Sequence, residues 1–253
     1  MMSRHATLST AQKTLLALRA STFYVGFFTL ILVISCACCV SFVLAPKQLQ
    51  AVASAGNYLT LSWLRFTCNI DVKVTGGEHI PTGACVILSN HQSAWESLYL
   101  QGLFQPVSFV LKRELLWIPL FGWTLALLRP IAIKRAKPAA AMRQVLKQGK
   151  SRLEEGLKVV IYPEGTRMDP GELGKFKSSG AAIAALAGVP ILPLSHNAGE
   201  HWTLHGFLKY PGTVYLNIGP AIDTSNNSAR ELTETARSWI DSSLKQHARQ
   251  LFP

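Results

Sequence analysis

The sequence predicts an α/β fold: a β-sheet flanked by helices, with an N-terminal membrane-embedded helix or two-helix hairpin. Residues 23–45 contain no charged side chain, and after residue 70 short runs of β-branched residues alternate with segments of helical periodicity. The length of 253 residues suits one compact domain with a smaller appendage. We therefore divide the chain into an N-terminal membrane-anchoring segment, residues 1–68, and a globular domain, residues 69–253.

Composition narrows the partners that the chain can have. Apolar residues make up 49% of the chain and charged residues 15%, which excludes a disordered protein. A net charge of +11 suits nucleic acid, an anionic membrane or an anionic substrate. The first acidic residue is Asp71, so the apolar N-terminal segment carries only basic charge. No nucleic-acid recognition motif accompanies that charge. We expect membrane lipid, and no nucleic acid, as a partner.

The N-terminal apolar run is long enough to cross a bilayer. As a helix, residues 23–45 would extend about 35 Å. A cleaved signal peptide is the main alternative, but it would need a shorter apolar region that ends at a small-x-small cleavage site. This run is long and ends at Pro46 and Lys47. The sequence therefore favours a segment that stays in the membrane.

Basic residues on both sides of the run bear on its orientation. Three precede the run and two follow it: Arg4, Lys13, Arg19, Lys47 and Arg65. Because positive charge is retained on the cytoplasmic side, both ends are drawn to that side. A hairpin that enters one leaflet satisfies both, and residues 49–66, with apolar residues at helical spacing, supply a second arm. A single span remains the alternative.

Six strands and four helices are expected in the globular domain. The strands are expected at residues 85–88, 108–111, 131–133, 159–162, 191–194 and 213–218. The helices are expected at residues 95–104, 139–155, 179–187 and 229–251. The last helix has an ordinary amphipathic pattern, which indicates packing on the core rather than a further membrane contact.

The cysteines and histidines predict no metal site. Three of the five cysteines lie in the apolar run, and we expect buried thiols in a reducing, cytoplasm-facing protein. His196, His201 and His205 match no known zinc-ligand spacing. The sequence has no G-x-S-x-G elbow and no P-loop, which disfavours serine-hydrolase and phosphoryl-transfer chemistry.

A histidine and a glutamate after the first predicted strand form a candidate catalytic pair. His91 can act as a general base, and Glu96 can orient the imidazole and stabilise its cation. Five residues turn through about 140° on an ideal helix, so His91 must lie in the loop or first turn before the helix. The alternative is a capping box over residues 93–96, in which Glu96 serves only the backbone.

The strand at residues 159–162 leads into a tight turn that can bind an anion. The turn offers the backbone N–H of Gly165, the hydroxyl of Thr166 and the guanidinium of Arg167, which is suited to bidentate contact with phosphate. Lys177, shortly before a predicted helix start, adds a second cationic element. The alternative is a surface turn with an exposed arginine.

Two further stretches complete the pattern. The strand at residues 131–133 ends in Lys134 and Arg135, which place more positive charge at what can be the same edge of the sheet. Simple solvation of the two side chains is the alternative. Residues 190–194 form an apolar strand bracketed by prolines, with a structural role.

Together these stretches resemble the lysophosphatidic acid acyltransferases, the 1-acyl-sn-glycerol-3-phosphate acyltransferase family of the glycerolipid acyltransferase superfamily, in its bacterial type. The resemblance covers about residues 70–222. Asn90, His91 and Glu96 match the first block of the family, Arg135 ends the second, Glu164, Gly165, Thr166 and Arg167 form the third, and residues 190–194 match the fourth. The usual acid of the first block is Asp, and Glu96 stands in its place.

The resemblance implies a glycerolipid-acyltransferase-like sheet and direct acyl transfer without an acyl-enzyme. His91, oriented by Glu96, would take the proton from the sn-2 hydroxyl of 1-acyl-sn-glycerol-3-phosphate. That hydroxyl would attack the thioester of acyl-CoA or acyl-carrier protein, and the product would be phosphatidic acid; no cofactor is expected beyond this co-substrate. The residues expected to hold the acceptor phosphate are Arg135, Glu164, Gly165, Thr166, Arg167 and Lys177.

The resemblance also implies a bacterial inner-membrane enzyme of phospholipid biosynthesis, with its catalytic domain facing the cytoplasm. Two alternatives stay open. Glu96 in place of the usual Asp leaves room for a different lyso-lipid acceptor. A catalytically inert lipid-binding protein is the other alternative, although an inert relative would be expected to lose His91 or Arg167, and both are present.

Overall fold

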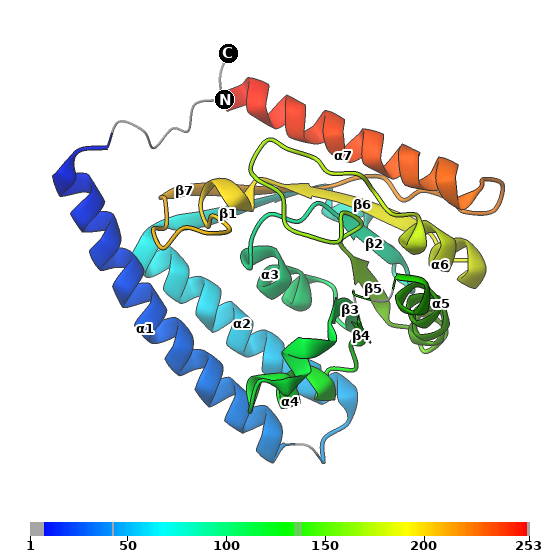
Figure 1. The fold of residues 1–253 in the computed structure, drawn as a ribbon, viewed down its shortest axis with the longest axis horizontal. Coiled ribbons are helices and arrows are strands. Elements are labelled where there is room, and N and C mark those ends of the chain that lie inside the picture. The colour runs from blue at the N-terminus through cyan, green and yellow to red at the C-terminus, as the bar shows by residue number, and fades with distance from the viewer. Residues whose placement is uncertain (1–7, 42, 135, 137, 252–253) are drawn as a thin grey trace.

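The computed structural model describes residues 8–41, 43–134, 136 and 138–251. Its centre is a seven-stranded sheet in the order β1-β7-β6-β2-β5-β3-β4. The strands are β1 (Ile70–Thr75), β2 (Val86–Ser89), β3 (Val107–Lys112), β4 (Ile131–Ile133), β5 (Lys158–Ile161), β6 (Ile191–His196) and β7 (Gly212–Ile218). Helices cover the sheet (Figure 1), so the predicted α/β fold is confirmed.

The sheet brings the ends of five strands together at one edge. β2 is parallel to both of its neighbours, β5 and β6. β5 is parallel to β3, and β3 is parallel to β4. The carboxyl ends of these strands therefore lie at the same edge, which is where ligands bind in open α/β sheets. β7 runs antiparallel to β6 and pairs in parallel with β1 at the outer edge.

The two faces of the sheet pack against different helices. The helices of the globular domain are α3 (Trp95–Leu103), α4 (Phe121–Leu127), α5 (Pro138–Glu154), α6 (Ser179–Ala187) and α7 (Ala229–Leu251), with short 3-10 helices η1 (Gly77–His79), η2 (Arg113–Trp117) and η3 (Ala198–Glu200). Successive side chains of a strand point to opposite faces. Val86 and Leu88 of β2 accordingly pack with residues of α5, α6 and α7, whereas Ile87 packs with residues of α3. This burial on both faces fixes β2 in the core.

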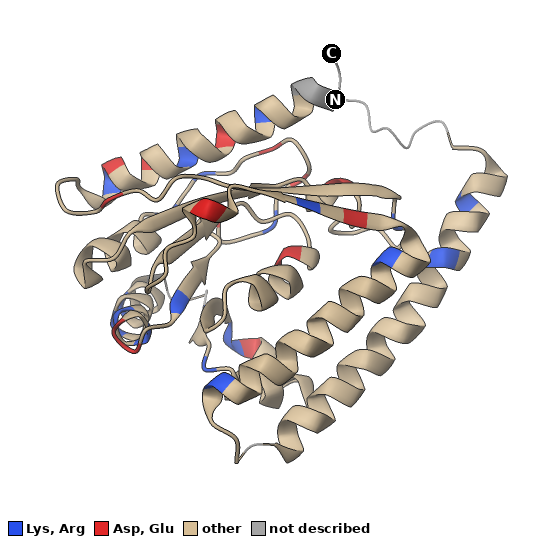
Figure 2. Ribbon diagram, turned by 180° about the vertical axis from the view of Figure 1, so that it is seen from behind, with Lys and Arg blue, Asp and Glu red and all other residues tan. Residues whose placement is uncertain are grey.

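Two long helices precede the sheet and pack together as a hairpin (Figure 1). They are α1 (Thr10–Val40) and α2 (Pro46–Cys68). The helices approach closely at Gly26, where an added Cβ would collide with the Trp63 indole. α1 is long and apolar enough to cross a membrane by length and composition. Figure 2 shows that charged residues stand only toward the ends of the two helices.

The hairpin is attached to the globular domain at two places along α1. Near the middle of this helix the rings of Phe23 and Trp202 lie 5.1 Å apart, edge to face. Toward its end the carbonyl of Ser35 accepts a hydrogen bond from the Thr124 hydroxyl at 3.3 Å. α2 packs on α3 between these points. α1 therefore lies alongside the domain rather than projecting from it.

The predicted elements of the globular domain are all present, and the structure adds β1, α4 and three short 3-10 helices. Each predicted strand and helix of the globular domain lies within two residues of its predicted bounds. The apolar run predicted at residues 23–45 lies in α1 as far as Val40, where the helix ends; residue 42 is outside the described residues, and residues 43–45 belong to the turn before α2. The second arm predicted at residues 49–66 lies within α2. The predicted division at residue 68 falls at the last residue of α2. β1 and α4 are elements that no sequence pattern above predicts.

Candidate active site

A short loop joins β2 to α3 and carries Asn90 and His91 at the carboxyl edge of the sheet. Asn90 pairs with the end of the neighbouring strand β6. Its side-chain amide donates to the His196 carbonyl at 2.9 Å, and its side-chain carbonyl accepts the His196 N–H at 3.0 Å. Nε2 of the His196 ring lies 3.0 Å from the Asn90 carbonyl. Three bonds between these two buried residues fix the backbone next to His91.

His196 has both ring nitrogens engaged within the protein. Nδ1 accepts the N–H of Ala198 at 3.3 Å, so the proton of the neutral ring lies on Nε2, which donates to Asn90. Burial lowers the pKa of His196 and favours this neutral form. His196 thus supports the loop that carries His91, and neither of its nitrogens is left to hold a substrate or a metal ion.

Glu96 contacts both His91 and the start of α3. Its Oε1 lies 2.7 Å from Nδ1 of His91 and also accepts the N–H groups of Gln92 and Ser93, at 3.0 and 2.8 Å. Glu96 therefore serves both His91 and the backbone, so the alternative in which it serves only the backbone is wrong, and the Ser93 hydroxyl accepts the Trp95 N–H instead of completing a capping box. His91 lies in the loop, since α3 begins only at Trp95.

The environment of Glu96 favours its ionised form although the residue is fully buried. Burial alone would raise the pKa of Glu96, but His196, His91 and the Ser93 N–H outweigh that effect and lower it. An ionised Glu96 accepts the Nδ1 proton of His91, which leaves the lone pair of the neutral ring on Nε2. Nε2 has no hydrogen-bond partner in the part of the chain that the structure describes. It is free to accept a proton from a substrate.

Tyr162, at the end of β5, holds the plane of the His91 ring. The two rings stack with centroids 4.0 Å apart and an interplanar angle of 8°. The Tyr162 hydroxyl lies 3.1 Å from Oγ of Ser97 on α3. Burial raises the pKa of Tyr162 far above its usual range, so the phenol stays neutral. Tyr162 therefore forms a flat, uncharged wall against the imidazole.

The turn after β5 holds the backbone of His91 from two sides. The Glu164 carboxylate accepts the N–H groups of His91 and Gly174, at 2.9 and 3.0 Å. The His91 carbonyl accepts the N–H of Met168 at 2.8 Å. Burial raises the pKa of Glu164, against the effect of its two N–H donors. Glu164 is among the residues predicted to hold phosphate, but its negative charge would repel an anion. Its contacts favour a role in positioning His91.

The other predicted anion-binding residues lie around the same turn. Gly165 has a φ of 74°, a conformation that favours glycine, and a Cβ there would come within 2.9 Å of Nζ of Lys177. The Lys177 ammonium therefore stands beside the turn. Thr166 and Lys177 are exposed, and Arg167 is half-buried. Neither Arg167 nor Lys177 forms an ion pair with a described residue, so both can bind an anion. Arg135 lies outside the described residues.

Two features of the site are absent from the sequence predictions: the pairing of Asn90 with His196 and the stacking of Tyr162 on His91. Asn90 directly precedes His91, and Tyr162 is the last residue of a predicted strand, so the sequence marks both positions as close to the site. The contacts themselves join residues far apart in the chain and depend on which strands are neighbours. A prediction that β6 and β5 flank β2 would have been needed to find them.

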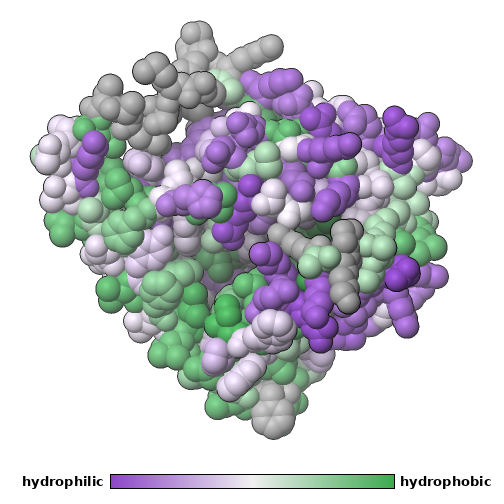
Figure 3. All heavy atoms as spheres, in the orientation of Figure 1, coloured by the Kyte–Doolittle hydropathy of each residue, from purple (hydrophilic) through white to green (hydrophobic). Residues whose placement is uncertain are grey.

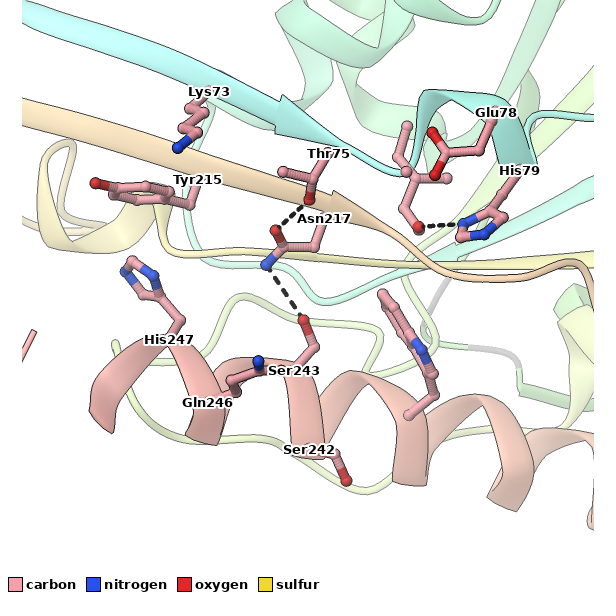
Figure 4. Close-up of a pocket in the computed structure, with 13 residues that line it drawn as sticks. Lys73, Thr75, Glu78, His79, Tyr215, Asn217, Ser242, Ser243, Gln246 and His247 are labelled. Carbon is pink, nitrogen blue, oxygen red and sulfur yellow. Dashed lines mark hydrogen bonds between the residues drawn. The ribbon is translucent and has the colours of Figure 1, made fainter. Parts of the chain in front are cut away.

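A separate hollow of about 520 Å³ lies between the β1–β7 edge and α7 (Figure 4). Within it the Thr75 hydroxyl donates to the Asn217 side chain at 2.7 Å, and the Asn217 amide donates to the Ser243 hydroxyl at 3.2 Å. None of its lining residues belongs to the His91 loop or to the turn after β5. The hollow is therefore distinct from the candidate active site.

Comparison with known proteins agrees with the geometry of the site. Residues 71–197 match the family model described as Acyltransferase. The 1-acyl-sn-glycerol-3-phosphate acyltransferase of Pseudomonas aeruginosa is 44% identical over 216 residues, which are 81% of this chain and 83% of that protein. Human 1-acyl-sn-glycerol-3-phosphate acyltransferase beta is 35% identical over 151 residues, which are 58% of this chain and 54% of the human protein.

A solved structure shares the fold. The crystal structure of the 1-acyl-sn-glycerophosphate (LPA) acyltransferase PlsC from Thermotoga maritima matches with a TM-score of 0.77 at 25% sequence identity. The match covers 91% of this chain and 95% of that one, so it includes most of the hairpin as well as the sheet. The chain therefore belongs to the acyltransferase family, as one of its 1-acyl-sn-glycerol-3-phosphate acyltransferases.

Proposed function

We propose that the protein transfers a fatty acyl chain from acyl-CoA or acyl-carrier protein to the sn-2 hydroxyl of 1-acyl-sn-glycerol-3-phosphate. The product is phosphatidic acid, an intermediate of phospholipid biosynthesis. One observation carries the proposal: Nδ1 of His91 is bound to the buried carboxylate of Glu96, while Nε2 is free. A free Nε2 with an oriented ring is what a general base for a hydroxyl requires.

In the proposed reaction Nε2 of His91 removes the proton from the acceptor hydroxyl. The oxygen attacks the thioester carbonyl, the C–S bond of the tetrahedral intermediate breaks, and the imidazolium returns the proton to the departing sulfur. Glu96 stabilises the imidazolium in between, because its carboxylate is ionised and 2.7 Å from Nδ1. General-base catalysis of this kind contributes ~10² to 10⁴ in rate.

The acceptor phosphate is proposed to bind at the turn after β5. Arg167 can form two parallel hydrogen bonds with phosphate oxygens, and Lys177 supplies a second positive charge beside Gly165. Thr166, exposed on the same turn, adds a hydroxyl, and Arg135 belongs to the proposal from its sequence motif. Met168 of this loop donates its N–H to the His91 carbonyl, so a shift of the loop on phosphate binding would also move His91.

We propose that the hairpin embeds in one leaflet of a bacterial inner membrane, with the globular domain on the cytoplasmic side. α1 contacts the domain at both Phe23 and Ser35, which are separated by about 18 Å along a helix. A perpendicular span would draw the domain elements at Ser35 into the bilayer. A hairpin that lies along one leaflet keeps both contacts, and Lys13 and Lys47, which stand near opposite ends of α1, can then both reach the head groups of that leaflet.

A different lyso-lipid acceptor is the second candidate, because Glu96 replaces the aspartate usual in the family. The deciding experiment incubates the purified protein with a thioester donor and, in separate reactions, lysophosphatidic acid, a lysophospholipid with a larger head group, and monoacylglycerol. Mass spectrometry of the products identifies the acceptor. Phosphatidic acid should dominate, and a preference for another acceptor with lysophosphatidic acid left unused would reject the proposal.

A further inference from the structure

A surface outside the N-terminal hairpin exposes several large apolar side chains. It is formed by η2 and α4, which follow β3 at the edge of the sheet that holds the candidate active site. Trp117 is 66% exposed, Trp123 54% and Ile118 45%. Pro119 between them is exposed as well. We call these four residues the η2–α4 surface. Residues 115–128 contain no charged side chain, so this part of the surface offers water no charged group to hydrate.

The side chains of this surface project from a compact unit. A Cβ at Gly122 would lie 2.5 Å from the Leu116 carbonyl oxygen, so a glycine is needed for α4 to pack this closely on η2. Leu120 has φ 61° and ψ −61°, and the N–H of Phe121 donates to the Pro119 carbonyl at 2.7 Å, which closes a three-residue turn. The exposed tryptophans are therefore held in place by the fold.

The η2–α4 unit is joined to α1 and continues its apolar surface. The Thr124 hydroxyl donates to the Ser35 carbonyl at 3.3 Å and lies 3.9 Å from Sγ of Cys39. Apolar residues of this half of α1 are more than half exposed: Leu32, Val33 and Val40. Figure 3 shows hydrophobic residues gathered over the lower left of the molecule, where α1, α2 and α4 lie in Figure 1.

Positive charge borders the η2–α4 surface. Lys112 ends β3 and is paired in register with Ile133 of β4, so Arg113 and Lys134 follow at the same edge. All three basic side chains are exposed, and none forms an ion pair with a described residue. The exposed Glu114 offsets one of these charges, so the border keeps a net positive charge. Tryptophan favours the boundary between water and lipid, and adjacent cations are attracted to anionic head groups. The combination fits an anionic lipid surface.

We propose that the η2–α4 surface is a second membrane-contact site, which places Trp117, Ile118 and Trp123 in the interface of an anionic bilayer. Because η2 and α4 follow β3, this contact brings the carboxyl edge of the sheet to the lipid surface. The inference rests on the proposed membrane location of the hairpin, and it adds a contact outside residues 1–68. The orientation of the active site toward its lipid acceptor would then depend on this surface.

The test uses the full chain reconstituted into vesicles of phosphatidylethanolamine and phosphatidylglycerol. In a Cys36→Ser, Cys39→Ser background, in which the remaining native thiols are buried, one cysteine at a time is introduced and labelled with an environment-sensitive fluorophore. Ile118→Cys probes the η2–α4 surface and keeps both tryptophans. Leu186→Cys on α6 is the matched control, because Leu186 is 54% exposed but lies away from α1. Val33→Cys on α1 reports whether the hairpin is in lipid.

The label at Ile118→Cys should shift its emission to shorter wavelength and be quenched by brominated lipid, while the label at Leu186→Cys stays in water. A water-exposed label at Ile118→Cys beside a quenched label at Val33→Cys would overturn the inference and leave the anchored hairpin intact. The inference would also be overturned if acyl carrier protein, and not lipid, protected the Ile118→Cys label from water. Labels in water at both positions would reject the membrane location as well.

A functional measurement separates this surface from the catalytic machinery. The double variant Trp117→Ser, Trp123→Ser should lose activity several-fold on acceptor embedded in vesicles. It should keep wild-type activity on a short-chain acceptor dissolved in water, which also shows that it is folded. Leu186→Ser should behave as wild type on both. Equal activity of the double variant and the wild type on vesicles would overturn the inference. Inactivity of the wild type on every acceptor would reject the proposed function, while the labelling result would stand.

Discussion

Glu164 accepts the backbone N–H of His91 at 2.9 Å, and 73 residues separate the two in the chain. This bond joins the loop after β2 to the turn after β5, which are neighbours because the two strands pair in parallel. The same turn carries Arg167, and its Met168 bonds to the His91 carbonyl. The proposed base and the proposed phosphate site therefore form one structural unit.

Replacing Glu164 by Gln should lower kcat for acceptors with and without phosphate alike. The amide has one oxygen for two N–H donors, and loss of a charge-assisted bond costs ~1.5 to 3 kcal/mol. We expect kcat to fall roughly 10-fold or more because His91 is less well positioned. Steady-state kinetics checks this, with Glu172→Gln, an exposed acid nearby, as control. An effect confined to the KM of the phosphate-bearing acceptor would instead mean that Glu164 acts at the phosphate.

Substitution of Glu96 separates its charge from its capping role. In Glu96→Gln the amide oxygen can still accept the N–H groups of His91, Gln92 and Ser93, so the fold and the ring orientation should persist. We expect kcat to fall roughly 10-fold, since a charge-assisted bond exceeds a neutral one by ~1 to 2 kcal/mol. Unchanged kcat, with an unchanged melting temperature, would mean that Glu96 only caps α3.

Glu96→Asp provides the complementary measurement. It keeps the charge but withdraws the carboxylate by one methylene, and aspartate is the usual acid of the family. We expect Glu96→Asp to retain more activity than Glu96→Gln. A small shift of the loop backbone can compensate for the shorter reach of Asp, whereas nothing restores the charge that Gln lacks. The opposite order would show that reach, rather than charge, decides the rate.

Lys209 should give the fold a measurable pH dependence. It is fully buried beside α1, and its Nζ donates to the Tyr24 hydroxyl at 2.7 Å and the Phe207 carbonyl at 3.0 Å. Burial lowers the pKa of Lys209 from 10.5 to about 8. Between these values the unfolded chain binds a proton that the folded chain has released, so the free energy of unfolding rises with pH across the window. The total gain is at most about 3 kcal/mol.

The comparison of the wild type with Lys209→Met isolates this effect. The difference in melting temperature, wild type minus variant, should be constant below about pH 8 and increase up to about pH 10.5. Lys175→Met, which changes an exposed lysine, should track the wild type at every pH. A difference that stays flat through the window would show that the Lys209 ammonium keeps an ordinary pKa despite its burial.

Arg167→Ala should weaken binding of the acceptor far more than binding of the thioester donor. An arginine with charge-assisted hydrogen bonds contributes ~1.5 to 3 kcal/mol, or roughly 10- to 150-fold in binding. The acceptor KM should rise, or kcat/KM should fall, by a factor in this range. Monoacylglycerol, which lacks phosphate, should be a poor acceptor for the wild type and hardly worse for the variant. Equal losses on both acceptors would place Arg167 at the donor or in the fold.

Local sequence patterns are sufficient for most of the fold and for the contact between His91 and Glu96. β4 and α6 have the predicted bounds, because periodicity and flanking turn residues define them locally. β1 escapes prediction because, as an edge strand, it buries little beyond Ile70 and leaves Lys73 exposed. α4 escapes because it is only seven residues long within a continuously apolar stretch, where helical periodicity cannot be distinguished.

The site shows the same division between local and distant information. His91 and Glu96 are only five residues apart, so the sequence offers them as a candidate pair once the other motifs are taken with them. The contact of Glu164 with the His91 N–H spans 73 residues, and that of His196 with Asn90 spans 106. Only the strand order brings these groups together. A sequence motif does not show whether a carboxylate accepts backbone N–H groups or faces a ligand. The sequence assigns Glu164 to the turn after β5, and its contact with the His91 N–H follows only from the pairing of β2 with β5.

The most direct test of the central claim is the rate of phosphatidic acid formation by purified His91→Ala, measured by mass spectrometry with lysophosphatidic acid and a thioester donor. The substitution removes Nε2 together with a largely buried ring that stacks on Tyr162. We expect the rate to fall by ~10² to 10⁴ while the protein stays folded, which its thermal melting curve checks. His79→Ala, which changes a histidine outside the site, should keep full activity. Wild-type turnover by folded His91→Ala would contradict the assignment of His91 as the base.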